Sequence, residues 1–365
     1  MCKSDKVNPY WITGAADTHF VGKAGDRSAC FGLQFTLSNP ATTIYSLKKS
    51  IKWPRYYSQK LENTVSEHER PFKLNPYFIT GFCDGESSFI VRVVKSVGYS
   101  TGWRVEPVFQ ITLHEKDLKL LEQIKYYFGE VGHIYHKKGN KSIQYHVGSI
   151  KNLKVLIDHF DKAPLITQKL SDYLLWKSVV ELVSNKEHLN REGLEKIVAI
   201  KASINLGLAN QLLEAFPNVT PWPKDLITNK KILDPEWIAG FVSGEGCFMI
   251  KINKPFGNRI SQVLLVFQIT QHKRDELLMR SLIEYFSCGK VYKRNDAYDF
   301  RVTKFSDLIT KIVPFFQNYP IQGVKHKDYL DWYKAVELII NKDHLTKQGV
   351  DFVFKLKEGM NTGRK

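Results

Sequence analysis

The chain has 365 residues, 43% of them hydrophobic, which is enough for two or three compact units with cores of their own. Lys and Arg number 53 against 37 Asp and Glu, and the resulting formal charge of +16 favours a polyanionic partner, nucleic acid before a membrane surface. Five scattered cysteines without a Cys-x-x-Cys pair argue against a disulfide framework or a zinc knuckle, and because no apolar run has the length of a signal peptide or a membrane helix, we expect a soluble intracellular protein.

The first 70 residues contain a partial echo of a segment further along the chain. NPYWITG at 8–14 differs from NPYFITG at 75–81 at one position, and His19 stands where the later copies have a glutamate. We interpret residues 1–70 as an N-terminal extension derived from a truncated copy of the repeat described below. So short a fragment has little core of its own, and we therefore expect it to be dispensable.

From residue 71 onward the chain contains two copies of one unit of roughly 150 residues. Four segments of the first copy return in the same order 156 to 159 residues later: NPYFITGFCDGESSFIV (75–91) as DPEWIAGFVSGEGCFMI (234–250), VFQITLHEKD (108–117) as VFQITQHKRD (266–275), YYFGEVGHIY (126–135) as EYFSCGKVY (284–292), and DYLLWKSVVELVSNKEHL (172–189) as DYLDWYKAVELIINKDHL (328–345). Constant order with a nearly constant offset indicates an internal duplication.

Each copy predicts the same order of elements: a short helix, two strands, a helix, two strands and closing helices. Pro76 and Pro235 suit the first turn of the opening helices. The next segments alternate as strands do, the FQIT segments are rich in β-forming residues, and the segments around Trp176 and Trp332 have the spacing of long amphipathic helices. The fold class is therefore α+β, present twice.

The repeat also predicts the domain boundaries. The first half-domain covers 71–206 and the second covers 234–362. Residues 207–233 contain three prolines and a lysine-rich run, and we interpret them as the linker.

The opening helices carry the pattern from which we infer chemistry. Two glycines stand four residues apart in each of them: Gly81 and Gly85 in the first copy, Gly240 and Gly244 in the second. Glycines at this spacing lie on one helical face, where the missing β-carbons let two helices approach backbone to backbone. Pairing the two helices about a pseudo-twofold axis would bring Glu86 and Glu245 side by side.

Two adjacent carboxylates repel each other unless a cation lies between them, and hard oxygen ligands with open water positions suit Mg²⁺. Mn²⁺ or Ca²⁺ could take its place. Such a pair can position water and stabilise the leaving oxygen in phosphodiester hydrolysis. If the motif occurred only once, Glu86 could equally be an ordinary helix-terminal glutamate. The acid recurs at the same position in the second copy, as Glu245, and this weakens that alternative.

The two segments resemble the paired signatures of the single-chain LAGLIDADG homing endonucleases, which are typically encoded in organellar introns of fungi. The similarity covers residues 75–362 and includes, in order, both signature helices, both FQIT segments, PLITQK/PIQGVK and NKEHL/NKDHL. The resemblance implies two αββαββα half-domains that form a saddle, with antiparallel strands in the DNA major groove. It further implies cleavage of both strands across the minor groove and metal binding by Glu86 and Glu245.

The resemblance implies further catalytic positions. Lys169 in PLITQK and Lys325 in PIQGVK match basic residues that lie near the scissile phosphates in the family, where they could support developing charge or order a water. Gln271 matches a solvent-positioning glutamine, but the first copy has Leu113 in its place, so this role would be one-sided.

Two other kinds of position are left open or without a catalytic role. The acid two residues before the first glutamate, Asp84, is Ser243 in the second copy, and we assign this position no catalytic role. The recurring His114 and His272 could contact the DNA backbone or be structural.

Alternation along the strands predicts the residues that contact DNA. Arg, Lys, Gln and Asn side chains match base edges in the major groove, although many such residues contact phosphates instead. The candidates are Arg92, Arg104, Gln110, Lys137, Gln144 and His146 in the first copy, and Lys251, Asn253, Gln262, Gln268, Arg294 and Arg301 in the second.

We therefore expect a monomeric, Mg²⁺-dependent, site-specific double-strand DNA endonuclease, mitochondrial by its family resemblance. One alternative is an RNA maturase of the same fold, whose partner would be intron RNA. Another is a non-catalytic, sequence-specific DNA-binding protein. Each copy retains its acid, Glu86 in the first and Glu245 in the second, and this favours cleavage. A protein that acts at a membrane surface would fit the charge but not the paired motif.

Overall fold

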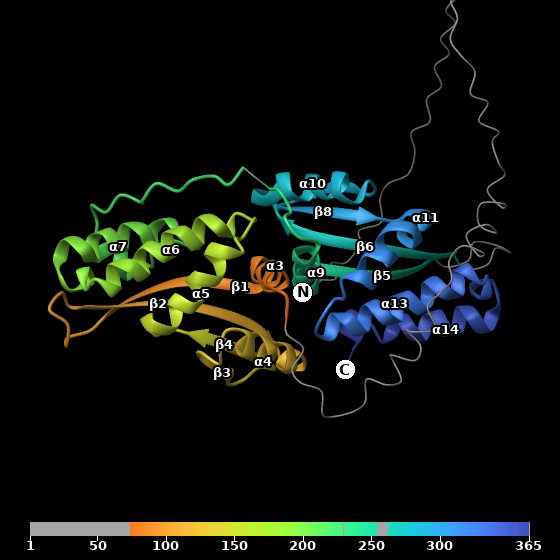
Figure 1. Ribbon diagram of the computed structural model, residues 1–365, viewed down its shortest axis with the longest axis horizontal. Helices are drawn as coiled ribbons and strands as arrows, with labels where there is room; N and C mark the ends of the chain where they lie inside the picture. The colour runs from red at the N-terminus through yellow and green to blue at the C-terminus, as the bar shows by residue number, and fades with distance from the viewer. Residues whose placement is uncertain (1–73, 229, 254–261, 365) are drawn as a thin grey trace, which may run out of the picture. The chain divides into compact units, whose positions relative to one another are not determined.

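The computed structural model describes residues 74–228, 230–253 and 262–364, and within them the repeat of sequence is a repeat of structure (Figure 1). The expectation for residues 1–70 lies outside the described residues. In the first half the elements are α3 (Pro76–Glu86), β1 (Ser87–Lys95), β2 (Trp103–His114), η1 (Glu115–Asp117), α4 (Leu118–Tyr127), β3 (His133–His136), β4 (Ser142–Val147), α5 (Ile150–Lys162), α6 (Lys169–Ser184), η2 (Glu187–Leu189) and α7 (Arg191–Ser203).

The second half follows after α8 (Asn210–Ala215). Its elements are α9 (Pro235–Glu245), β5 (Gly246–Asn253), β6 (Gln262–His272), η3 (Lys273–Asp275), α10 (Glu276–Phe286), β7 (Lys290–Arg294), β8 (Ala297–Val302), α11 (Phe305–Asp307), a π-helical turn (Leu308–Ile312), α12 (Val313–Asn318), α13 (Val324–Ile340), η5 (Asp343–Leu345) and α14 (Lys347–Glu358). The predicted α+β class with two αββαββα halves is confirmed.

Each half contains one four-stranded antiparallel sheet. The strand order is β1-β2-β4-β3 in the first half and β5-β6-β8-β7 in the second. Strands such as β1 and β4 alternate between buried and more exposed residues, because one face of each sheet packs against helices. Strand β6 departs from this pattern, since residues 265–269 are all buried. In Figure 1, α5 and α6 lie against the sheet of the first half, and α13 lies against that of the second.

The cores of the two halves are built from equivalent residues. In the first half the Phe89 ring packs 5.2 Å from Trp176, and in the second the Phe248 ring packs 5.3 Å from Trp332, measured between ring centroids. The amphipathic segments around these two tryptophans are therefore helices whose apolar face closes the core. None of the helices in the described part of the chain is long and apolar enough to cross a membrane.

The two opening helices begin where the sequence predicts. Asn75 accepts a hydrogen bond from the Tyr77 amide at 2.8 Å, and Asp234 accepts one from the Glu236 amide, also at 2.8 Å. In each helix a proline follows this capping residue, where its lack of an amide hydrogen costs no bond.

The segment between the halves is only partly extended. Leu212 of α8 and Phe216 are buried in the core of the first half, where the Phe216 ring lies 5.5 Å from that of Trp103. Beyond them the linker runs along α6, and the Gln168 side chain both donates to the Ile227 carbonyl (2.7 Å) and accepts from its amide (3.1 Å). The linker is thus held against the first half along much of its length.

Candidate active site and nucleic-acid interface

Helices α3 and α9 pack against each other through the four glycines of the motif. A β-carbon on Gly81 would collide with the Trp237 carbonyl oxygen, and one on Gly240 would collide with the Phe78 carbonyl oxygen. The two clashes are equivalent under the pseudo-twofold relation of the halves. Contact at this range is open only to glycine, so the motif fixes how closely the halves approach.

The close approach brings the two glutamates to one place. A β-carbon on Gly244 would lie 3.0 Å from Cγ of Glu86, and one on Gly85 would lie 3.2 Å from Cγ of Glu245. Each glutamate therefore lies against the glycine that precedes the other. Burial raises the pKa of Glu245, and the negative charge of Glu86 raises it further. The pair has the mutual repulsion that a bound cation would relieve.

The donor set fits a hard divalent cation. The protein ligands would be the carboxylate oxygens of two residues, Glu86 and Glu245. Within the described residues, no larger group of three or more His, Cys, Asp or Glu side chains is placed to hold a metal ion. Two carboxylates leave most coordination positions to water and phosphate oxygens, as in the sites that Mg²⁺ occupies in phosphoryl-transfer enzymes.

One lysine from each half lies beside this pair. The Lys169 ammonium donates to the carbonyls of Cys83 (2.9 Å) and Gly85 (3.1 Å), and the Lys325 ammonium donates to the Gly244 carbonyl. Each lysine thus meets the carbonyl end of its own signature helix, which carries partial negative charge. Burial lowers the pKa of Lys169, although the nearby acids oppose this effect.

Asp84, for which we predicted no catalytic role, is a buried contact between the halves. Its carboxylate accepts from the Ile166 amide (3.0 Å), from the Thr167 amide (3.2 Å) and hydroxyl (2.5 Å), and from Nε1 of Trp237 in the second half (2.8 Å). In the second half Ser243 replaces it, and its hydroxyl accepts from the Gln322 amide at 3.0 Å. Both positions therefore hold the segment that precedes a candidate active-site lysine, Lys169 or Lys325.

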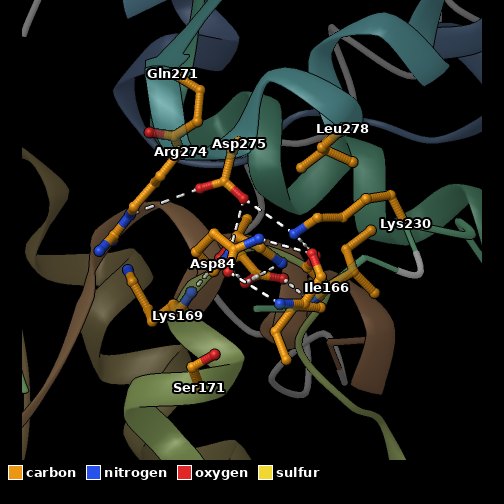
Figure 2. A network of polar contacts seen from close by, with 12 residues as sticks. Asp84, Ile166, Lys169, Ser171, Lys230, Gln271, Arg274, Asp275 and Leu278 are labelled. Carbon is orange, nitrogen blue, oxygen red and sulfur yellow. Dashed lines mark hydrogen bonds and ion pairs between the residues drawn. The ribbon is translucent and has the colours of Figure 1, made fainter. Parts of the chain in front are cut away.

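Figure 2 shows the polar network around the first of these segments. Asp275, from the second half, accepts from the Gln168 amide at 2.8 Å and pairs with Lys230 of the linker at 3.1 Å. Lys230 also donates to the Ile166 carbonyl at 2.8 Å. The linker, the first half and the second half meet in this network, which lies beside Lys169.

The remaining catalytic and histidine candidates have local partners. The Gln271 side chain accepts from the His272 amide at 2.8 Å, and its solvent-positioning role stays a prediction. His114 and His272 accept through Nδ1 from the amides of Lys116 (3.2 Å) and Arg274 (3.3 Å) and thereby cap the 3-10 helices η1 and η3. This equivalent capping supports the structural alternative for both histidines.

The predicted DNA-contacting residues lie on one face of each sheet, except Lys137, which follows the last residue of β3. The register pairs Val94 with Arg104 and Gln110 with His146 in the first sheet, and Asn253 with Gln262 and Gln268 with Arg301 in the second. This is the face opposite the apolar cores. The exposed members are Arg92, Arg104, Lys137, Lys251, Asn253, Gln262 and Arg294; the partly buried ones are Gln110, Gln144, His146 and Arg301; Gln268 is buried and donates to Thr270.

Sequence reasoning missed an acid on this face. Asp299 is fully buried and pairs with Arg301 at 2.7 Å and with Arg294 at 3.4 Å, while the Arg301 guanidinium lies 5.5 Å from the Tyr292 ring centroid. Alternation along β8 places Asp299 on this face, but only the fold brings the two arginines to it. The first sheet has the neutral Gln144 at the equivalent position, so the two faces differ in charge and chemistry.

The chain is similar to known proteins over most of this length. Residues 79–180 and 238–336 match the family model described as LAGLIDADG endonuclease. The chain belongs to the LAGLIDADG endonuclease family. The two matched segments contain most of each opening helix, all the strands of both sheets, and the candidate residues Lys169 and Lys325.

Several relatives of this LAGLIDADG chain are fungal. It is 40% identical over 294 residues to probable intron-encoded endonuclease 3 of Neurospora crassa. The aligned region covers 79% of this chain and 55% of that protein. It is 38% identical over 321 residues to probable intron-encoded endonuclease 2 of the same fungus, with 84% and 70% covered. The chain thus spans little more than half the length of the first relative.

Solved LAGLIDADG structures share the fold. The I-SmaMI homing endonuclease bound to cleaved DNA superposes with a TM-score of 0.78 at 48% identity, covering 81% of this chain and all of that one. I-GzeII in complex with its DNA target superposes with a TM-score of 0.75 at 42% identity and covers 80% of this chain. Another structure of I-SmaMI holds an uncleaved DNA target in the presence of calcium ions.

Proposed function

We propose that this LAGLIDADG chain is a site-specific DNA endonuclease that works as a single chain and cuts both strands of a long, asymmetric duplex. The observation that carries the proposal is the pairing of Glu86 and Glu245 across the glycine contact of α3 and α9. One carboxylate from each half provides one acid for each strand, and the open faces of the two sheets provide an extended surface for the duplex. The DNA-bound state of I-SmaMI and I-GzeII supports the same substrate class.

Glu86 and Glu245 would hold the divalent cation, Mg²⁺ in the cell. When bound, it would supply Lewis-acid stabilisation of the phosphate and a more acidic water. The chain's own residues place the reacting groups. Lys169 and Lys325, beside the two acids, would each present a positive charge to one scissile phosphate as negative charge develops on it. Rigid backbone contacts to both lysines favour such preorganisation.

We place this activity in the fungal mitochondrion because of the family resemblance, and we expect an intron-encoded protein because relatives from Neurospora crassa are named as probable intron-encoded endonucleases. The two rivals predict other features. A non-catalytic DNA-binding protein has no need of two intact acids at the helix contact. An intron RNA maturase could coexist with cleavage, and binding of intron RNA would test for it directly.

The test of function is also a prediction about symmetry. Incubating the protein with Mg²⁺ and a randomised duplex library, then sequencing the cut ends, should recover one long site of about two helical turns that is cut at its centre. The site should not be a palindrome, because equivalent reading positions differ between the halves. Arg92 in the first half is matched by Lys251 in the second, and His146 is matched by Arg301. Arg301 and Arg294 both pair with the buried Asp299.

Each good base contact discriminates by ~1–3 kcal/mol, so a few unequal positions are enough to disfavour a palindrome. Recovery of a perfect palindrome would contradict the assignment of the reading faces. Absence of any cut ends, with Mn²⁺ as well as Mg²⁺, would overturn the proposed activity itself.

The affinity for this site should depend steeply on salt. If the two sheet faces neutralise about ten phosphates, the logarithm of the association constant should fall with the logarithm of salt concentration at a slope on the order of −9. A filter-binding titration from low to physiological salt, with Ca²⁺ in place of Mg²⁺, measures this slope. A nearly flat response would argue against an extended duplex interface despite the charge of +16.

A further inference from the structure

We propose that each half positions the active-site lysine of the other half, through Asp117 acting on Lys325 and Asp275 acting on Lys169. The inference rests on the proposed function. Both aspartates act through hydrogen bonds that they accept from backbone amides.

We call each of these two connections an arm. The first arm connects Asp117 in the first half to Lys325 in the second. Asp117, the last residue of η1, accepts a hydrogen bond from the Val324 amide at 2.7 Å. Val324 is the first residue of α13, and the next residue is Lys325, whose ammonium donates to the Gly244 carbonyl. Gly323 has φ of +72°, and a β-carbon there would collide with the Asp117 carboxylate, so the turn is shaped to admit this acid.

The second arm runs in the opposite direction and is equivalent by sequence position. Asp275, the last residue of η3, accepts from the Gln168 amide at 2.8 Å. The next residue is Lys169, the first of α6, whose ammonium donates to the carbonyls of Cys83 and Gly85. In both arms an acid satisfies an amide at a helix start, where no intrahelical acceptor exists. That acid comes from the other half.

The two arms differ in how the acid is neutralised. Lys230 of the linker pairs with Asp275 at 3.1 Å, with side chains only 4% and 1% exposed, and Arg274 lies 3.8 Å from the same carboxylate. Within the described residues Asp117 has no ion pair. The linker is therefore a structural part of the Lys169 arm alone.

The physical consequence is strand-specific. The backbone of a lysine one residue from an anchored amide moves only if the helix start moves, and its ammonium contacts depend on where that backbone lies. A displacement of about 1 Å in an active site can reduce a rate by ~10²-fold. Loss of the Asp117 bond should therefore misplace Lys325 and spare Lys169. Loss of the Asp275 bond should do the reverse.

The test measures the cleavage of each strand separately, with the two strands of the selected site carrying different end labels. Lys325→Met and Lys169→Met first show which strand depends on which lysine. Asp117→Ala should slow the Lys325-dependent strand ~10–100-fold and leave the other within about threefold, so that nicked DNA accumulates. The ratio of the two strand rates does not depend on the fraction of folded protein, which separates positioning from a general loss of stability.

Matched variants sharpen the first arm. Asp117→Asn keeps an oxygen that can accept from the Val324 amide, so it should restore a strand ratio close to that of the unmodified protein. Glu115→Ala removes an exposed acid from the same turn, and it should leave the ratio unchanged. A ratio that moves as far in Glu115→Ala as in Asp117→Ala would overturn the inference, because charge alone would then explain it.

The second arm has a different rescue. Asp275→Ala should slow the Lys169-dependent strand, while Asp275→Asn should fail to rescue it, because Lys230 would stay buried without a counter-charge. Asp275→Asn combined with Lys230→Met removes both charges and keeps the acceptor, so it should recover the ratio. Equal slowing of both strands by Asp117→Ala and by Asp275→Ala would overturn the inference. Failure of the unmodified chain to cut would overturn the proposed function instead.

Discussion

Glu86→Gln and Glu245→Gln should each reduce DNA cleavage by on the order of 10³-fold and leave the affinity for the uncut site largely intact. Glutamine keeps the shape of the side chain but removes a negative charge from the cation site, and metal stabilisation of a transition state is worth several kcal/mol. Single-turnover cleavage at saturating enzyme measures the rate, and a filter-binding titration in Ca²⁺ measures affinity.

Glu122→Gln is the matched control for these variants, because Glu122 is an exposed glutamate on α4. It should cleave at the rate of the unmodified protein. If either Glu86→Gln or Glu245→Gln kept a near-normal rate, the paired glutamates would not be the cation ligands, and the active site would have to be sought elsewhere.

Gly81→Ala and Gly240→Ala should each lower the free energy of unfolding by at least ~3 kcal/mol. The added methyl group would meet a backbone carbonyl of the opposite helix, and backbone cannot rotate away as a side chain can. Relief would require α3 and α9 to separate, which would also move Glu86 away from Glu245. Urea unfolding followed by tryptophan fluorescence measures the loss.

Gly98→Ala is the control for the glycine variants, because a β-carbon on Gly98 would meet no atom within 4 Å. It should change the unfolding free energy by less than ~1 kcal/mol. A loss below ~1 kcal/mol in Gly81→Ala would show that the two helices can move apart at little cost, contrary to the close contact described above.

The sequence predicted the features that repeat. The duplication, the order of elements and the α+β class follow from periodicity and from constant offsets between copies. The placement of Glu86 beside Glu245 follows from the spacing of the glycines. These predictions were possible because the glycine spacing is a local pattern within one helix, and because the duplication is visible when the sequence of one half is compared with that of the other.

Other features could not be predicted because their partners are remote. Asp84 binds Ile166, Thr167 and Trp237, which lie 82 to 153 residues away, and nothing near Asp84 in the sequence indicates them. The lysine-rich run of the linker gave no sign that Lys230 would be buried.

Asp117 and Asp275 did leave a signal, as the recurring last acid of VFQITLHEKD and VFQITQHKRD. An acid that recurs after two β-rich segments could be a ligand, a cap or a surface charge. Only the fold shows that each faces a helix start in the other half.

The hydrogen bond between Asp84 and Trp237 bears on how such a protein could be rebuilt. A homodimer made from two copies of the first half would place Phe78 where the second half has Trp237, because these residues occupy the same position in the repeat. Both copies of Asp84 would then lose the indole donor that each needs at the dimer contact. Conversion of this chain to a symmetric enzyme would therefore require Phe78→Trp as a first step, and the two halves are better exchanged between relatives as a matched pair than one at a time.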